Sequence, residues 1–291
     1  MTLQEKIRAG KFVVLGEFEP PKGADFSLLG TSANLSRGRL DAAVVPEMAN
    51  AVLKASSLGG CAFLQKEGLE TVFQVCCRDR NRLALQADLL SASALGIKNV
   101  MAVSGEDIRF GDHPQGRTVN DLDLMGLLEA VQKLQNGKDL SGIELRGSPR
   151  FCVGSTLDTG APGGLLNIEL ENLKRKVDFG VEYVVTNPIF DLRRFEQFIK
   201  RIDVKPLAVI PTVLLLKSAG MARYIDRNIK GISIPPEMIR DIQKAPDKVK
   251  ECIRIAAEIV TRIKEMGMAG VLISTVGWEE KLPLILDEAK L

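Results

Sequence analysis

Short apolar runs alternate with amphipathic stretches along most of this chain. Nearly every run, rich in β-branched residues, is followed by apolar positions at helical spacing. Near-continuous apolar strands that alternate with helices are typical of a parallel sheet. Eight such units predict a single-domain (β/α)8 barrel over residues 1–291. The eight predicted strands cover residues 11–18, 41–45, 70–76, 99–105, 148–156, 182–186, 205–210 and 269–275.

An open, doubly wound sheet is the alternative architecture. It is less favoured because no Gly-x-Gly-x-x-Gly motif follows the first predicted strand. No linker or break in composition divides the chain, which favours one domain. The helical pattern predicts helices near residues 25–37, 50–67, 78–96, 121–136, 166–180, 217–229 and 247–266. The segment 105–119 has no such pattern, and a loop of this length is usually functional or disordered.

In a barrel of this kind the chemistry takes place at the carboxyl ends of the strands. The residues predicted there are mostly polar or acidic, and they contain no pair of histidines. They are Glu17, Glu19, Pro46, Glu47, Gln74, Gly105, Glu106, residues 155–159, Thr186, Asn187, Pro211, Thr212 and Ser274.

Two carboxylates two positions apart, Glu17 and Glu19, stand in "GEFEPPKG" at the end of the first predicted strand. Strand geometry would place both on one face, toward the mouth of the barrel. There one could act as a general acid or base, with its pKa raised by burial and by its like-charged neighbour. The alternative is a solvated loop start in which a carboxylate pairs with Lys22.

Charge and composition exclude several classes of function. The chain carries 39 basic and 37 acidic side chains, and only 5% of its residues are aromatic. Without a basic face or stacking platforms, nucleic-acid binding is not expected. No run of 18 apolar residues predicts a membrane span, and the first residues show no apolar leader. Five cysteines, two of them adjacent, indicate reduced thiols and therefore a cytoplasmic protein.

For the remaining reactive side chains, structural roles are favoured over catalytic ones. His113 is the only histidine, so a histidine-based metal site is not expected, and a capping or turn role is the alternative to catalysis. Cys76 and Cys77 could pair with it as nucleophiles, but core packing is the favoured role of both. The basic run Lys174, Arg175 and Lys176 is expected to form a solvated helix face.

Several long segments resemble the methylenetetrahydrofolate reductase family. They are "GEFEPPKG", "CCRDRNRLALQADLLSASALGIKNVMAVSGED", "FGDHPQGRTVNDLDL", "NLKRKVDFGVEYVVTNPIFD" and "IPTVLLLKSAGMARYIDRNIKGISIPPEM". They occur in the family's order from the first predicted strand to about residue 240. The resemblance implies a (β/α)8 barrel that binds a tetrahydrofolate derivative at the carboxyl ends of its strands.

The resemblance also assigns residues to the folate. It implies that Glu17 is the acid near the pterin, that Glu106 stands where the family has Asp, and that Asn187 stands where it has Gln. Carboxylates and amides suit the donor and acceptor edge of a pterin. Gln74, Glu19 and Tyr224 are further candidates for folate contacts.

At three positions that the resemblance gives to the flavin, this sequence departs from the family pattern. Pro46 replaces a Thr and has neither a hydroxyl nor an N–H. Asn120 replaces an aromatic residue, and Asp158 lies in "LDTGAPGG", where the family has a Val-Asn-Pro stretch. The folate half of the site is therefore expected to be kept, and FAD to be absent.

The function expected from these features is a flavin-free methyltransferase that moves a methyl group between N5 of tetrahydrofolate and a corrinoid protein. The alternatives are FAD-dependent reduction of methylene- to methyl-tetrahydrofolate, flavin-free reduction by a nicotinamide, and a non-catalytic folate-binding subunit. Neither the direction of transfer nor the type of pterin follows from the sequence. A homo-oligomer is compatible with the sequence.

Overall fold

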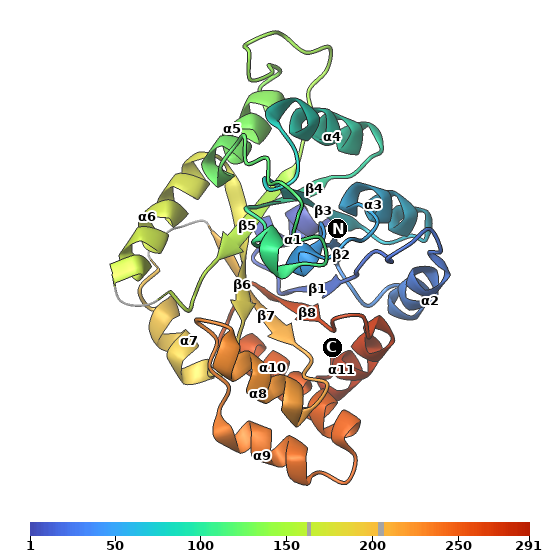
Figure 1. Ribbon diagram of the computed structural model, residues 1–291, viewed down its shortest axis with the longest axis vertical. Helices are drawn as coiled ribbons and strands as arrows, with labels where there is room; N and C mark the ends of the chain where they lie inside the picture. The colour runs from blue at the N-terminus through green and yellow to red at the C-terminus, as the bar shows by residue number, and fades with distance from the viewer. Residues whose placement is uncertain (162–163, 203–206) are drawn as a thin grey trace.

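Eight parallel strands close into a barrel in the computed structural model, which describes residues 1–161, 164–202 and 207–291 (Figure 1). Each strand pairs with its neighbours in chain order, and β1 pairs with β8. The predicted (β/α)8 fold is confirmed. The strands are β1 (Val13–Glu17), β2 (Ala42–Val45), β3 (Thr71–Cys76), β4 (Asn99–Val103), β5 (Cys152–Leu157), β6 (Val181–Pro188), β7 (Ala208–Leu214) and β8 (Gly270–Ser274).

The strands differ from their predicted bounds by up to four residues at an end, and two of these differences change the candidate site. β7 runs through Pro211 and Thr212 to Leu214, so these two residues lie inside the strand and not at its end. The start of the predicted run, residues 205 and 206, lies outside the described residues. β1 ends at Glu17, so Glu19 belongs to the following loop and does not share a strand face with Glu17.

Helices surround the barrel (Figure 1). They are α1 (Leu3–Arg8), α2 (Ser27–Ser36), α3 (Ser57–Lys66), α4 (Arg82–Ala94), α5 (Leu124–Gln135), α6 (Gly164–Asp178), α7 (Leu192–Ile199), α8 (Ala219–Asn228), α9 (Pro236–Lys244), α10 (Lys248–Glu265) and α11 (Leu282–Glu288). Short 3-10 turns, η1 (Ala49–Ala51), η2 (Ile108–Phe110) and η3 (Glu279–Lys281), lie in loops.

The sequence pattern missed α1, α7, α9 and α11, which have only six to nine residues each. Local signals for two of them were nevertheless present. Thr2 and Glu5 form a capping box at the start of α1. Asp191 caps α7, and Phe195 and Phe198 form its buried face at a spacing of three.

Apolar side chains fill the interior of the barrel. Alternate residues of the strands point inward, as in Val13 and Leu15 of β1 and Val72 and Cys76 of β3. The phenol ring of Tyr183 is fully buried and needs a glycine opposite, since a Cβ on Gly154 would lie 2.2 Å from that ring. Below the carboxyl ends of the strands, the interior of the barrel is therefore a packed core and not a channel.

Helix α1 closes the amino-terminal end of the barrel. Leu3 joins the interior cluster, and its N–H donates to the carboxylate of Glu70, just before β3. Arg8 pairs with Glu182 near the start of β6. Among the described residues, α1 therefore covers the amino-terminal end of the barrel interior.

The segment 105–119 folds over the carboxyl ends of the strands in front of the barrel (Figure 1). Gly111 packs directly on the backbone of Ala51, where an added Cβ would lie 1.9 Å from the carbonyl oxygen. Asp112 pairs with Lys22 and accepts the N–H of Leu53. The long loop of the sequence is thus attached to the loops after β1 and β2. No helix within the described residues has the length and apolar character to cross a membrane.

Candidate functional site

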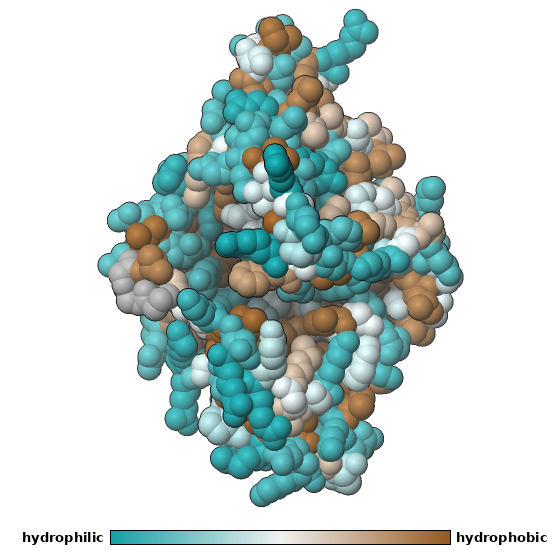
Figure 2. Space-filling model, in the orientation of Figure 1, coloured by the Kyte–Doolittle hydropathy of each residue, from teal (hydrophilic) through white to brown (hydrophobic). Residues whose placement is uncertain are grey.

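The carboxyl ends of the strands face the viewer in Figure 1, and this face is hollowed across its middle in Figure 2. The inward alternation of each strand continues to this end. It brings Glu17 of β1, Gln74 of β3, Asn187 of β6 and Ser274 of β8 to the inner side of the mouth. Residues far apart in the sequence therefore form one polar ring above the apolar core.

Glu17 is the acid at the centre of this site. Its carboxylate accepts a hydrogen bond from the Ser274 hydroxyl at 2.5 Å, across the seam between β1 and β8. Burial is the main cause that raises the pKa of Glu17 to about 7; the Ser274 hydrogen bond lowers it, and the negative charges of Glu19, Glu279 and Glu106 raise it. By surface area Glu17 is half-buried, with its open side toward the mouth. Such a group can both give and take a proton near neutral pH.

Glu19 lies beside this acid but has its own cation. The Lys54 ammonium is 3.1 Å from its carboxylate, while Lys22 pairs with Asp112. The alternative in which a carboxylate of this stretch pairs with Lys22 is therefore wrong. Burial raises the pKa of nearby Glu279, and the charge of Glu19 raises it further. Glu17 thus lies in an acidic neighbourhood that disfavours its ionised form.

The raised pKa of Glu17 predicts a pH-dependent stability. The pKa is about 7 in the folded chain against an ordinary value of 4.5. The stabilising contribution is therefore full below pH 4.5 and is lost as the pH rises through 7. Relative to Glu17→Gln, wild type should lose on the order of 2 kcal/mol across this range, allowing for solvent at the mouth. Urea unfolding of both proteins at several pH values measures this difference in the free energy of unfolding. If the free energy changes with pH equally in the two proteins, the prediction is wrong.

Gln74 is held by Glu47, the second residue after the end of β2. Its Oε1 accepts the backbone N–H of Glu47 at 2.8 Å. Glu47 is itself buried: its carboxylate accepts the N–H of Ser57 at 2.7 Å and pairs with Arg80 at 2.8 Å. A buried ion pair and a helix start thereby fix the loop that orients Gln74.

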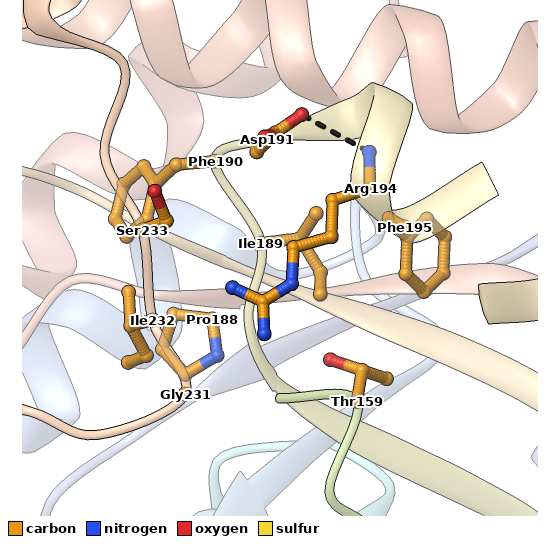
Figure 3. Close-up of a pocket in the computed structure, with 10 residues that line it drawn as sticks. All are labelled: Thr159, Pro188, Ile189, Phe190, Asp191, Arg194, Phe195, Gly231, Ile232 and Ser233. Carbon is orange, nitrogen blue, oxygen red and sulfur yellow. Dashed lines mark hydrogen bonds between the residues drawn. The ribbon is translucent and has the colours of Figure 1, made fainter. Parts of the chain in front are cut away.

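Asn187 is held by the loop after β5. Its Oδ1 accepts the Thr159 hydroxyl at 2.6 Å and the Thr159 backbone N–H at 3.1 Å. Thr159 also lines a separate cavity between β6, α7 and residues 231–233, into which the Arg194 side chain points (Figure 3).

Glu106 lies at the edge of the mouth. Its side chain is 56% exposed, and its Oε2 is 3.6 Å from the guanidinium of Arg78, which is buried and also donates to the Glu106 carbonyl at 3.2 Å. Sequence reasoning missed Arg78. The signal available was its position directly after the strand end, in "CCRDR".

Tyr224, a predicted folate contact, lies on α8 and is 63% exposed. No hydrogen bond of the described residues joins its hydroxyl to Glu17, Gln74 or Asn187. Its role stays a prediction.

The other reactive side chains are placed as follows. The exposed His113 ring lies 2.8 Å from Asp112, which fits a turn role, and the described residues contain no group of three or more side chains that could hold a metal. Burial raises the pKa of Cys76 to about 11 and of Cys77 to about 12, as expected for core thiols. All five cysteines are free and buried. The expectation of a solvated basic run is wrong for Lys176, which is buried and donates to the Thr156 carbonyl at 2.7 Å.

The residues at the three positions that the resemblance gives to a flavin offer few of the groups that it implies. Pro46 directly follows β2 and is buried, offering no donor. Asn120 adopts a left-handed backbone with φ of 43° beside the cavity that Arg78 and Glu106 line. The Asp158 carboxylate accepts the N–H of Gly160 at 2.8 Å, so it shapes its own loop. None of the three supplies the hydroxyl or aromatic ring that the resemblance implies.

Fold and site together define a (β/α)8-barrel protein whose mouth holds a carboxyl group able to exchange a proton near neutral pH. The chain belongs to the methylenetetrahydrofolate reductase family, whose sequence model matches residues 2–290.

Two curated relatives share this family. Methylenetetrahydrofolate reductase 2 of Schizosaccharomyces pombe is 21% identical over 240 residues, covering 78% of this chain and 37% of that protein. The probable methylenetetrahydrofolate reductase (NADPH) of Caenorhabditis elegans is 21% identical over 202 residues, covering 68% of this chain and 28% of that protein. The chain thus matches only about a third of the length of these relatives.

Solved structures share the fold. A Clostridium thermocellum protein that binds two copies of 5-methyl-5,6,7,8-tetrahydrofolic acid has a TM-score of 0.68 and 14% identity, covering 99% of this chain and 97% of that one. EDTA monooxygenase from Chelativorans sp. BNC1 has a TM-score of 0.57 and 9% identity, covering 96% and 92%.

Proposed function

We propose that this protein is a tetrahydrofolate enzyme of one-carbon metabolism, and that it transfers a methyl group between N5 of the folate and a corrinoid protein without a flavin. The observation that carries the proposal is the half-buried Glu17, with a pKa of about 7, at the inner side of the mouth. Family membership and the methyl-tetrahydrofolate bound by the Clostridium thermocellum protein support folate as the ligand.

Glu17 would manage the proton at N5. In the direction of methyl gain, the N5 lone pair attacks the methyl carbon carried by the corrinoid. The N5–C bond forms, and the C–Co bond breaks with both electrons left on cobalt. The N5 proton passes to the Glu17 carboxylate. In the reverse direction Glu17 returns that proton, which makes the folate nitrogen a better leaving group for attack by reduced cobalt.

A pKa close to 7 suits both directions, because comparable amounts of the acid and its conjugate base are present near neutral pH. The polar groups around Glu17 would hold the pterin in line for transfer, so positioning would supply much of the rate. Asn187 and Gln74 offer amides there, and Glu106 offers a carboxylate. Ser274 would keep the Glu17 carboxylate in one orientation.

The absence of a flavin is part of the proposal. It is supported by Pro46, Asn120 and Asp158, which lack the groups that the family resemblance implies for flavin contacts. The hollowed face of the barrel (Figure 2) leaves room for a second carrier to approach the folate.

FAD-dependent reduction of methylene- to methyl-tetrahydrofolate is the second candidate. Family membership and the names of both curated relatives favour it. Reduction needs a hydride carrier against the pterin, so the two candidates differ in whether a flavin is bound.

The spectrum of the purified protein separates the candidates. We expect no flavin absorbance, and near-stoichiometric flavin would overturn the methyltransferase proposal in favour of the reductase. The colourless protein, mixed with methylated corrinoid protein and tetrahydrofolate, should form methyl-tetrahydrofolate. If no methyl transfer occurs but NADH or NADPH reduces methylene-tetrahydrofolate, the protein is a flavin-free reductase. Folate binding without either reaction would indicate a non-catalytic subunit.

A further inference from the structure

Two amide side chains at the barrel mouth are held by their oxygen atoms. Oδ1 of Asn187 accepts from the Thr159 backbone N–H and hydroxyl, and Oε1 of Gln74 accepts from the Glu47 backbone N–H. Within the described part of the chain, neither NH2 group has an acceptor. Both residues lie on inward positions of their strands, so their NH2 groups remain for a ligand.

The orientation of these amides follows from chemistry. Amide oxygen and nitrogen usually have to be assigned from the surrounding hydrogen bonds. A backbone N–H can only donate, so the atom that faces it must be the amide oxygen. Rotation of either amide by 180° would bring N–H against N–H and leave a donor unsatisfied, at a cost. The mouth therefore presents two fixed donors.

Two donors that are fixed in this way favour ligands whose pterin ring presents acceptors to them. A tetrahydropterin has acceptors at O4 and N1, whereas its 2-amino group, N3–H and N8–H are donors. In a 2,4-diamino analogue, position 4 becomes a donor and N1 becomes the preferred site of protonation. The acceptors at O4 and N1 are then lost, and the acceptor that N3 becomes lies between two amino groups.

We propose that Thr159 is a positioning residue that fixes Asn187 as a donor, and that this makes the site selective for 4-oxo pterins over 2,4-diamino pterins. The inference rests on the proposed folate function and names the part of the ligand that the site recognises.

The loop that carries Thr159 is built to hold this position. Asp158 accepts the N–H of Gly160, and Gly160 packs on the backbone of Gly231, where an added Cβ would lie 2.2 Å from a carbonyl oxygen. In the view of Figure 3, Thr159 lies below the Arg194 guanidinium, which contacts the Gly160 carbonyl at 3.5 Å. Thr159 is thus placed by its neighbours and does not depend on a ligand for its position.

The test measures the dissociation constants of 5-methyl-tetrahydrofolate and of 5-methyl-tetrahydroaminopterin, its 2,4-diamino analogue, by calorimetry. Wild type should bind the 4-oxo ligand at least about tenfold more tightly, since a mismatched hydrogen-bonding edge costs a factor of this order. Asn187→Asp keeps both bonds from Thr159 but replaces the donor by an acceptor, so it should reverse the preference.

Thr159→Val removes the hydroxyl and leaves the backbone N–H, so it should reduce the preference severalfold without abolishing it. Thr261→Val is the matched control, because its hydroxyl donates to the Ala257 carbonyl within α10. The readout is the ratio of two dissociation constants, which a general loss of folded protein does not change.

The outcomes separate this inference from the proposed function. If wild type binds 5-methyl-tetrahydrofolate but does not discriminate, or if Asn187→Asp and Thr159→Val keep the wild-type ratio, the selectivity inference fails and the folate function stands. If wild type binds neither ligand, both fail. A reversed preference in Asn187→Asp together with a reduced one in Thr159→Val supports the inference.

Discussion

Replacing Glu17 by Gln should remove most turnover and leave folate binding within a few-fold of wild type. The substitution keeps the size and the Ser274 contact but removes the proton carrier. General acid–base groups contribute about 10²- to 10⁴-fold to rates, so a loss of this order in kcat is expected. Methyl transfer or reduction, whichever the protein performs, is followed at saturating folate, and binding is measured separately.

The dependence of the reaction rate on pH should reflect the titration of Glu17. In the proposed mechanism, removal of the methyl group from N5 needs protonated Glu17, so the rate of this reaction should fall as the pH rises through about 7. Methyl gain needs the ionised form and should fall as the pH decreases through the same range. The Ser274 hydrogen bond lowers the pKa of Glu17, so Ser274→Ala should move either profile to higher pH. Unchanged turnover in Glu17→Gln would remove Glu17 from the mechanism.

Replacing Glu47 by Ala should destabilise the fold strongly. The Glu47 side chain is 1% exposed, and its carboxylate neutralises Arg80 and satisfies the Ser57 N–H at the start of α3. Removing one partner of a buried ion pair typically costs about 3–5 kcal/mol. Urea unfolding of Glu47→Ala and wild type measures this difference.

Glu258→Ala is the matched control for Glu47→Ala. Glu258 pairs with Arg254 at 3.0 Å on the surface of α10, with 63% of its side chain exposed, and exposed pairs contribute little. If Glu47→Ala does not fold, Glu47→Gln gives a milder measurement. Equal midpoints for Glu47→Ala and the control would show that the buried pair contributes no net stability.

The spacing of apolar residues along the chain was sufficient to predict much of the fold. Eight apolar runs at the right spacing predicted the barrel, because strands buried on both faces need apolar residues at nearly every position. The helices that went unpredicted are the shortest ones, where few turns are available for a 3.6-residue period to appear. The misplaced strand bounds have a similar cause, since period alone does not say where hydrogen bonding to a neighbour ends.

Within the site, most predicted positions were reached from the end of one strand, but the contacts join different strands. Glu17 and Ser274 are 257 positions apart and meet only because β1 and β8 close the barrel. The pairing of Glu19 with Lys54 could not be chosen over Lys22 from proximity in sequence, because Lys22 reaches Asp112 in the segment 105–119. Arg78, at the edge of the mouth, was missed because nothing local shows that its charge is buried.

By itself the sequence determined the fold class, the family and the strand ends that supply polar groups, because these depend on local periodicity and on ordered motifs. Only the tertiary structure decided how those groups act. Closing the barrel buries Glu17 among other carboxylates and raises its pKa, and docking the loop of Thr159 against β6 fixes which end of the Asn187 amide faces the mouth. Both effects arise from desolvation and from hydrogen bonds between distant segments, which no local pattern of residues specifies.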